Sequence, residues 1–122
     1  CLFDYAGIDS PAAKFENMVA LELFRAVSNW NAQGLGNFAL HYIRNREKEE
    51  VDFVLSQKNR PLLLIEAKSA DSNPAKQLLK FQRLLDIPAV QLVNIPGVCK
   101  RISNGRQKLL IISADRWLAQ LP

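Results

Sequence analysis

Short runs of aliphatic residues separated by polar turns divide most of this 122-residue chain into strand-like and helix-like stretches. Residues 50–55 and 62–67 both read as strands, because β-branched and aliphatic side chains dominate them and the polar stretch between them has hairpin length. Asp52 interrupts the first run and Glu66 the second, and Lys68 follows directly. Side chains alternate across a strand, so Glu66 and Lys68 share one face. Burying such charges is costly unless they are paired or bind a metal, which makes these strands the candidate functional centre.

The remaining pattern predicts helices before and after these strands. Apolar residues recur at helical spacing over residues 11–29, with Ser10 as the expected N-cap, and again over residues 75–85. Further strands are expected at 38–44, 89–93 and 108–112, a basic loop from 96 through 106, and a short last helix capped by Ser113. This order predicts an α/β fold with a mixed central sheet flanked by helices: a three-strand antiparallel meander, a helical crossover and further strands.

Composition narrows the class of protein. A length of 122 residues, with 48% hydrophobic and 23% charged residues, fits a single globular domain over residues 1–122. No apolar run approaches the roughly 20 residues of a membrane span, and no secretory signal is visible, so we expect a cytoplasmic protein without a membrane partner. Cys1 and Cys99 are too few for a disulfide framework and are expected to be reduced thiols. The net charge of +4 permits a nucleic-acid partner without demanding one.

Glu16 joins the candidate centre from the first helix, where helical spacing places it inside the apolar stripe. If the two central strands pair, Asp52 approaches Glu66 and Lys68, and the helix can bring Glu16 to them. Close carboxylates repel each other unless a cation lies between them, and oxygen-rich sites suit Mg²⁺ or Mn²⁺. The alternative is a structural network of ion pairs, in which Glu16 is neutralised by a neighbour such as Lys14 or Arg25. His41 is the single histidine, so a serine-type triad is excluded, and we expect His41 to be a surface or half-buried strand residue.

These residues resemble a known signature. Asp52 followed by Glu66-Ala67-Lys68 is similar to the D…(D/E)-x-K motif of the PD-(D/E)XK nuclease superfamily, whose core is helix, three strands, helix, strand, with an acidic residue on the first helix. Glu16 matches that acidic residue. Val51 stands where the superfamily name has Pro, and Gln77 resembles the Gln of a Gln-x-x-x-Tyr element of RecB-like nucleases in which Phe81 replaces the Tyr. More narrowly, residues 14–23, 50–55 and 65–69 resemble the uncharacterised C-terminal domain of many archaeal and bacterial AAA-type ATPases, over about residues 14–120.

The resemblance implies a restriction-endonuclease-like fold and a Mg²⁺-dependent deoxyribonuclease that hydrolyses DNA phosphodiesters. Its implied metal ligands for Mg²⁺ or Mn²⁺ are Asp52, Glu66 and Glu16, with Lys68 and Gln77 completing the catalytic set. An ATPase module would precede Cys1 in the full-length protein, so we expect this chain to be the C-terminal part of a longer one. The alternative function is a catalytically silent module that binds DNA or a protein partner for that ATPase. Basic residues expected to contact DNA phosphates are Lys14, Arg44, Arg46, Lys76 and Lys80.

Overall fold

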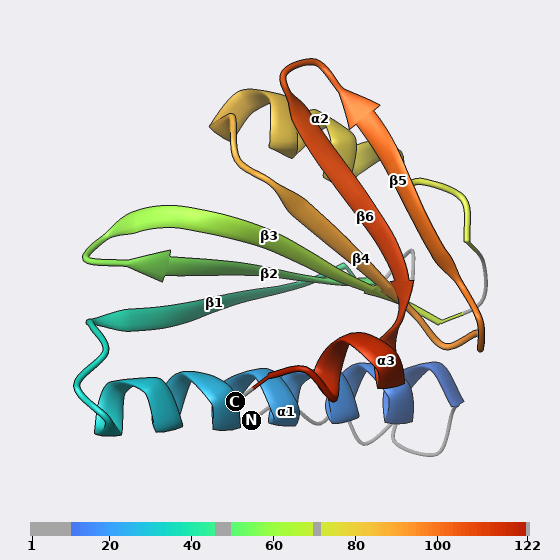
Figure 1. Ribbon diagram of the computed structural model, residues 1–122. Helices are drawn as coiled ribbons and strands as arrows, with labels where there is room; N and C mark the ends of the chain where they lie inside the picture. The colour runs from blue at the N-terminus through green and yellow to red at the C-terminus, as the bar shows by residue number, and fades with distance from the viewer. Residues whose placement is uncertain (1–10, 46–49, 70–71, 122) are drawn as a thin grey trace.

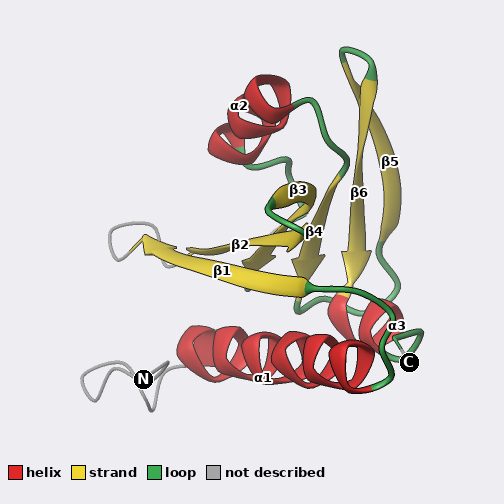
Figure 2. Ribbon diagram, turned by 90° about the vertical axis from the view of Figure 1, so that its left-hand side faces the viewer, coloured by secondary structure: helices red, strands yellow, loops and turns green. Residues whose placement is uncertain are grey.

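A computed structural model describes residues 11–45, 50–69 and 72–121. Within these ranges the side chains of residues 43–45 and 50–52 are not described. In this part of the chain, six strands form one mixed sheet in the order β1-β2-β3-β4-β6-β5, with helices on both of its faces (Figures 1 and 2). The elements are α1 (Pro11–Ala32), β1 (Phe38–Asn45), β2 (Glu50–Gln57), β3 (Arg60–Lys68), α2 (Lys76–Leu85), β4 (Ala89–Val93), β5 (Cys99–Asn104), β6 (Gln107–Ser113) and α3 (Ala114–Leu118). The predicted α/β class is therefore confirmed.

The long helix α1 and the short helix α3 cover one face of the sheet (Figure 1). The apolar stripe predicted for α1 is buried there, with Phe15, Val19 and Leu23 packed against Ile65 and neighbouring strand residues. Trp30, near the end of α1, is half-buried and packs against Phe38 at the start of β1, with ring centroids 5.2 Å apart and ring planes tilted by 58°. This contact closes the corner where the chain turns from α1 into the sheet.

Helix α2 covers the opposite face. Leu78 of α2 packs there against residues of β3, β4 and β6 that alternate along each strand with those facing α1. These strand residues are Leu64, Ala89, Val93, Leu109 and Ile111. Because both faces are covered, these strands are apolar on both sides, and β4 is buried over its whole length. Any polar residue on these strands is therefore enclosed and must find a partner.

The strand connections agree with the predicted topology. β1, β2 and β3 form an antiparallel meander, and α2 is the crossover that returns the chain to β4, which lies parallel to β3. The β2–β3 connection is tighter than the six-residue segment expected, because Lys58 and Asn59 both adopt positive φ angles, 51° and 66°, in a two-residue hairpin loop. β4 and β6 are also parallel, so the carboxyl ends of β3, β4 and β6 lie at one edge of the sheet.

Two predictions about the C-terminal third were wrong. Residues 99–104, expected within a loop, form the edge strand β5, which pairs antiparallel with β6 through a two-residue loop that begins with Gly105 at φ 64°. Ser113 precedes α3 as expected, yet its hydroxyl does not cap that helix: Oγ donates to the Ile95 carbonyl and accepts from the Val98 amide, 2.9 Å away. It fixes the loop between β4 and β5 instead. The expected cap Ser10 lies outside the described residues.

Candidate functional site

Glu66 lies in the middle of the sheet and is almost completely buried, with 1% of its surface exposed. Its neighbours Ile65 and Ala67 face α1, so strand alternation places Glu66 on the face that α2 covers. In the β2–β3 register, Asp52 is directly opposite Glu66. Residues opposed in this way share a face and have Cβ atoms roughly 4.5–5.5 Å apart. The backbone thus has the register that the carboxylate-pair hypothesis requires; the carboxylate positions themselves stay a prediction, since the Asp52 side chain is not described.

Lys68, at the end of β3, lies beside the loop that leads into α2. Its ammonium group donates to the Asn73 carbonyl, with Nζ and O 3.4 Å apart. The same carbonyl accepts a shorter bond of 2.7 Å from Nε2 of Gln91, and Oε1 of Gln91 accepts from the Ala75 amide at 2.9 Å. Gln91 is fully buried on β4 and pairs in register with Glu66. The structure therefore brings Glu66, Lys68, Gln91 and the backbone of this loop together at the carboxyl end of β3.

Glu16 is buried as the helical pattern predicted, with 3% of its surface exposed. It lies on α1, which covers the sheet face opposite to the one Glu66 occupies. Of the two basic residues considered as structural partners, Arg25 pairs with Glu22 at 3.3 Å and Lys14 is exposed. The structure therefore separates Glu16 from Glu66 by the sheet, and the three-carboxylate set stays a prediction. Among the described side chains, no three Asp, Glu, His or Cys residues gather in a metal-binding group.

The other predicted site residues are spread over the structure. Gln77 is half-buried on the first turn of α2, and Phe81 one turn later is partly exposed. Lys76 and Lys80 lie exposed on the same helix and line a surface cavity, whereas Lys14 is exposed on α1 in the other layer. The Arg44 side chain and the whole of Arg46 lie outside the described part of the chain. His41 is an exposed residue on the edge strand β1, in agreement with the prediction, and Cys99 is an exposed free thiol.

Sequence reasoning missed Gln91 and Arg83. Gln91 is the single polar residue in the buried run of β4, and a polar side chain in a strand covered on both faces must be satisfied by hydrogen bonds. That rule was sufficient to single it out, although not to identify the loop it binds. No pattern in the sequence singles out Arg83, because its partner Asn104 is 21 residues away on a strand that was not expected.

Within the described ranges no helix is long and apolar enough to cross a membrane.

Comparison with known proteins gives one family and no individual relative. No curated protein and no solved structure matches the chain. The family model that matches covers residues 12–109 and describes a domain of unknown function, DUF4143, which is often found in AAA ATPase-associated proteins. The match spans most of the chain, including α1, the central hairpin and α2, so this protein belongs to the DUF4143 family.

Proposed function

We propose that this domain is a metal-dependent nuclease that hydrolyses DNA phosphodiesters, attached in its full-length protein to an ATPase. The observation that carries the proposal is Glu66: a glutamate buried in the centre of the sheet, in register with Asp52 and two residues from Lys68. Two opposed carboxylates on a covered face repel each other, and this arrangement is favourable when a cation neutralises them. A structural ion pair needs one acidic and one basic residue. It gives no reason for two carboxylates in register on neighbouring strands of the core.

The donor set fits Mg²⁺ or Mn²⁺, because carboxylate oxygens are the ligands these ions prefer. Asp52 and Glu66 would hold the ion, with Glu16 acting directly or through water. The ion would supply a Lewis acid for the scissile phosphate and a more acidic water. Lys68 would donate hydrogen bonds to the phosphate oxygens on which negative charge builds, and its contact with the Asn73 carbonyl holds the ammonium at the carboxyl end of β3. Gln77 completes the expected set from α2.

The proposal is tested by cleavage of fluorescently labelled single-stranded, duplex and branched DNA in the presence of Mg²⁺ or Mn²⁺. Glu66→Gln keeps the size of the side chain and removes its charge, so cleavage should fall at least about a hundredfold, the scale for loss of one group that stabilises the transition state. Glu22→Gln is the matched control, because Glu22 is a carboxylate of α1 that pairs with Arg25 and is not in the proposed set. The proposal is contradicted if the unaltered protein cleaves no DNA with either metal, or if both variants lose cleavage equally. Either result would favour the alternative, a catalytically silent module that binds DNA or a protein partner.

A further inference from the structure

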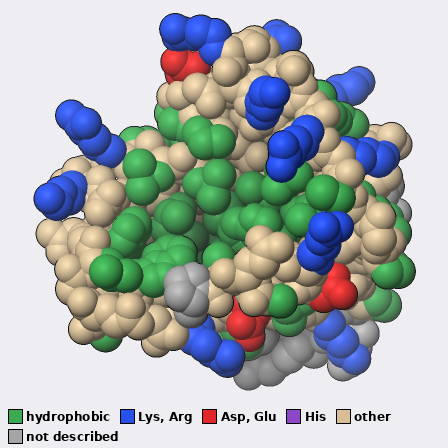
Figure 3. Space-filling view, viewed as in Figure 1, with side chains coloured by type: hydrophobic (Ala, Val, Ile, Leu, Met, Phe, Trp, Pro, Cys, Tyr) green, Lys and Arg blue, Asp and Glu red, His purple; other side chains and the backbone are tan. Residues whose placement is uncertain are grey.

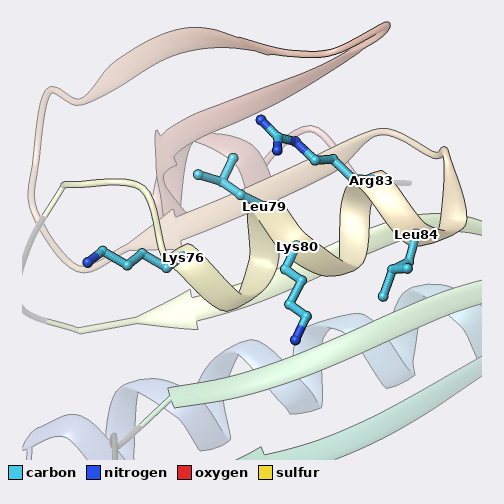
Figure 4. Close-up of a pocket in the computed structure, with 5 residues that line it drawn as sticks. All are labelled: Lys76, Leu79, Lys80, Arg83 and Leu84. Carbon is cyan, nitrogen blue, oxygen red and sulfur yellow. The ribbon is translucent and has the colours of Figure 1, made fainter.

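The outward face of α2 carries a groove that the candidate site does not use. A surface cavity of about 500 Å³ lies there, and the described residues that line it all come from this one helix (Figure 4). The spacing of these residues at i, i+3, i+4, i+7 and i+8 places them on a single stripe along the helix. The lining residues are Lys76, Leu79, Lys80, Arg83 and Leu84.

The groove is positively charged, and no acidic residue is among the described residues that line it. Three of its five residues are cationic, and α2 has no Asp or Glu over its length. The nearest carboxylate along the chain, Asp86 at the C-cap, is bound instead to Arg106 at 2.8 Å. The groove therefore has cationic charge available for an anionic ligand. In the view of Figure 3, α2 lies behind β6, and that side of the molecule shows instead a hollow of hydrophobic side chains with Lys and Arg side chains around it.

Arg83 is oriented by a buried amide network. Its Nε donates to Oδ1 of Asn104 at 2.8 Å, and Asn104 is only 5% exposed. Nδ2 of Asn104 donates in turn to the Leu79 carbonyl and to Oε1 of Gln82, at 3.0 and 2.9 Å. Gln82, which is fully buried, donates to the Lys108 carbonyl at 2.8 Å. Because the partner of Nε is a neutral carboxamide, this bond orients the guanidinium without placing a negative charge beside it, an arrangement that suits anion recognition.

The groove begins where the candidate site ends. Lys76 is the first residue of α2 and directly follows the loop whose Asn73 carbonyl binds both Lys68 and Gln91. At about 1.5 Å per residue, the seven steps from Lys76 to Arg83 span about 10 Å, enough for two or three successive phosphates of one strand. Leu79 and Leu84 offer apolar surface on either side of the line of cations (Figure 4).

We propose that the α2 groove binds the phosphate backbone of a nucleic-acid strand and leads it from the Glu66–Lys68 site along the helix. This inference rests on the proposed function, because it assigns the path of that substrate. A line of cations with no interspersed acid suits the regularly repeated charges of a phosphodiester chain. An acidic protein partner is the competing occupant, which the experiment below separates from a nucleic acid.

Fluorescence anisotropy with a labelled thymidine oligonucleotide, in EDTA so that no cleavage occurs, measures the binding directly. The variant Lys76→Gln/Lys80→Gln/Arg83→Gln should bind at least about tenfold more weakly at low salt. Its slope of log affinity against log salt should become shallower by about 2, because each phosphate of a single strand that a cation neutralises contributes about 0.7. The matched control Lys58→Gln/Arg101→Gln/Arg116→Gln lowers the net charge of +4 by the same three units at exposed positions outside the groove. Equal weakening in the two variants would overturn the proposal.

A single exposed substitution keeps the test independent of folding defects. Leu84 is 70% exposed, so Leu84→Glu places a carboxylate beside Lys80 without disturbing the core. It should weaken oligonucleotide binding, whereas Leu35→Glu, at a 58% exposed residue of the loop before β1, should not. Retention of full affinity in Leu84→Glu would contradict the groove, as would displacement of the oligonucleotide by polyglutamate at equal charge concentration.

The two proposals fail in different ways. If oligonucleotide binding depends on the α2 residues and no metal supports cleavage, the proposed binding groove is supported and the proposed hydrolysis is wrong. If the protein cleaves DNA and the α2 triple variant binds the oligonucleotide like the unaltered protein, the groove is wrong and the hydrolysis stands. Glu66→Gln should reduce cleavage at least about a hundredfold and keep oligonucleotide binding.

Discussion

Gln91 on β4 is the in-register neighbour of Glu66 on β3, and its carboxamide ties down the loop that follows Lys68. Both polar atoms of this fully buried side chain are used, one by the Ala75 amide and one by the Asn73 carbonyl. The candidate site and the start of α2 are therefore joined through one residue. Disturbing Gln91 should affect both the stability of the fold and the placement of Lys68.

We expect Gln91→Leu to destabilise the protein by about 1–3 kcal/mol, the cost of leaving a buried polar group such as the Ala75 amide without a partner. Urea unfolding followed by circular dichroism measures this free energy. Gln77→Leu is the control, because Gln77 lies half-buried on the helix that this loop precedes. Equal unfolding free energies for Gln91→Leu and the unaltered protein would contradict the role of Gln91 in holding the loop.

The β2–β3 hairpin loop has backbone strain that substitutions in the loop could relieve. Lys58 and Asn59 both have positive φ angles, which suits the Asn-Gly pair of a tight hairpin loop better than the residues present. The double variant Lys58→Asn/Asn59→Gly should raise the unfolding free energy by about 1 kcal/mol, the scale of the left-handed backbone cost for a residue with a Cβ. Lys58→Gln removes the same charge and keeps the strain. The expectation is wrong if both variants melt at the same temperature.

Much of this fold could be predicted from periodicity because its strongest patterns are local. The stripe of α1 and the aliphatic runs of β2, β3 and β4 mark elements whose cores are now seen to be buried. β5 was missed because Lys100 and Arg101 make it polar, as suits an exposed edge strand, although the Asn104-Gly105 pair is a strong hairpin signal. Ser113 was misassigned because a hydroxyl before a helix can bind a neighbouring loop as readily as the helix amides.

For the candidate site, the sequence could predict which strands carry Asp52 and Glu66, but not the hydrogen bonds around them. Strand alternation and hairpin pairing give Glu66 and Asp52 their shared register without any tertiary information. The hydrogen bonds of Gln91 and Arg83 join residues 16 to 21 positions apart through the crossover and the β5–β6 hairpin. Such bonds depend on how α2 packs on the sheet, which no local pattern fixes.

Asp52→Asn tests the carboxylate pair through metal binding. A metal that binds only the folded protein should stabilise it by about 2.7 kcal/mol at a hundred times its Kd, which raises the Tm by several degrees. Asp52→Asn should abolish this rise with Mn²⁺ and leave the metal-free protein as stable or more stable, because one of two repelling carboxylates has been neutralised. Asp115→Asn, at an exposed residue of α3, should keep the rise. A full metal-dependent rise in Asp52→Asn would exclude Asp52 as a ligand.

Glu16→Gln tests whether the buried glutamate of α1 takes part from the opposite layer. If Glu16 helps to hold the ion directly or through water, the variant should show a smaller Mn²⁺-dependent rise in Tm, with part of the effect kept by Asp52 and Glu66. Glu22→Gln, a carboxylate on the same helix paired with Arg25, should behave like the unaltered protein. An unchanged rise in Glu16→Gln would remove Glu16 from the metal set.

Lys68→Ala separates an active site from a structural network of ion pairs. If Lys68 helps to hold two carboxylates together, its removal should lower the Tm of the metal-free protein, and Mn²⁺ should compensate because the ion takes over the neutralising charge. Cleavage should disappear while metal binding remains. In a purely structural network, both Lys68→Ala and Asp52→Asn would destabilise the fold by leaving a buried charge without its partner, and metal would change neither Tm. Thermal melts of these two variants and the unaltered protein, with and without Mn²⁺, therefore decide between the two accounts of Glu66.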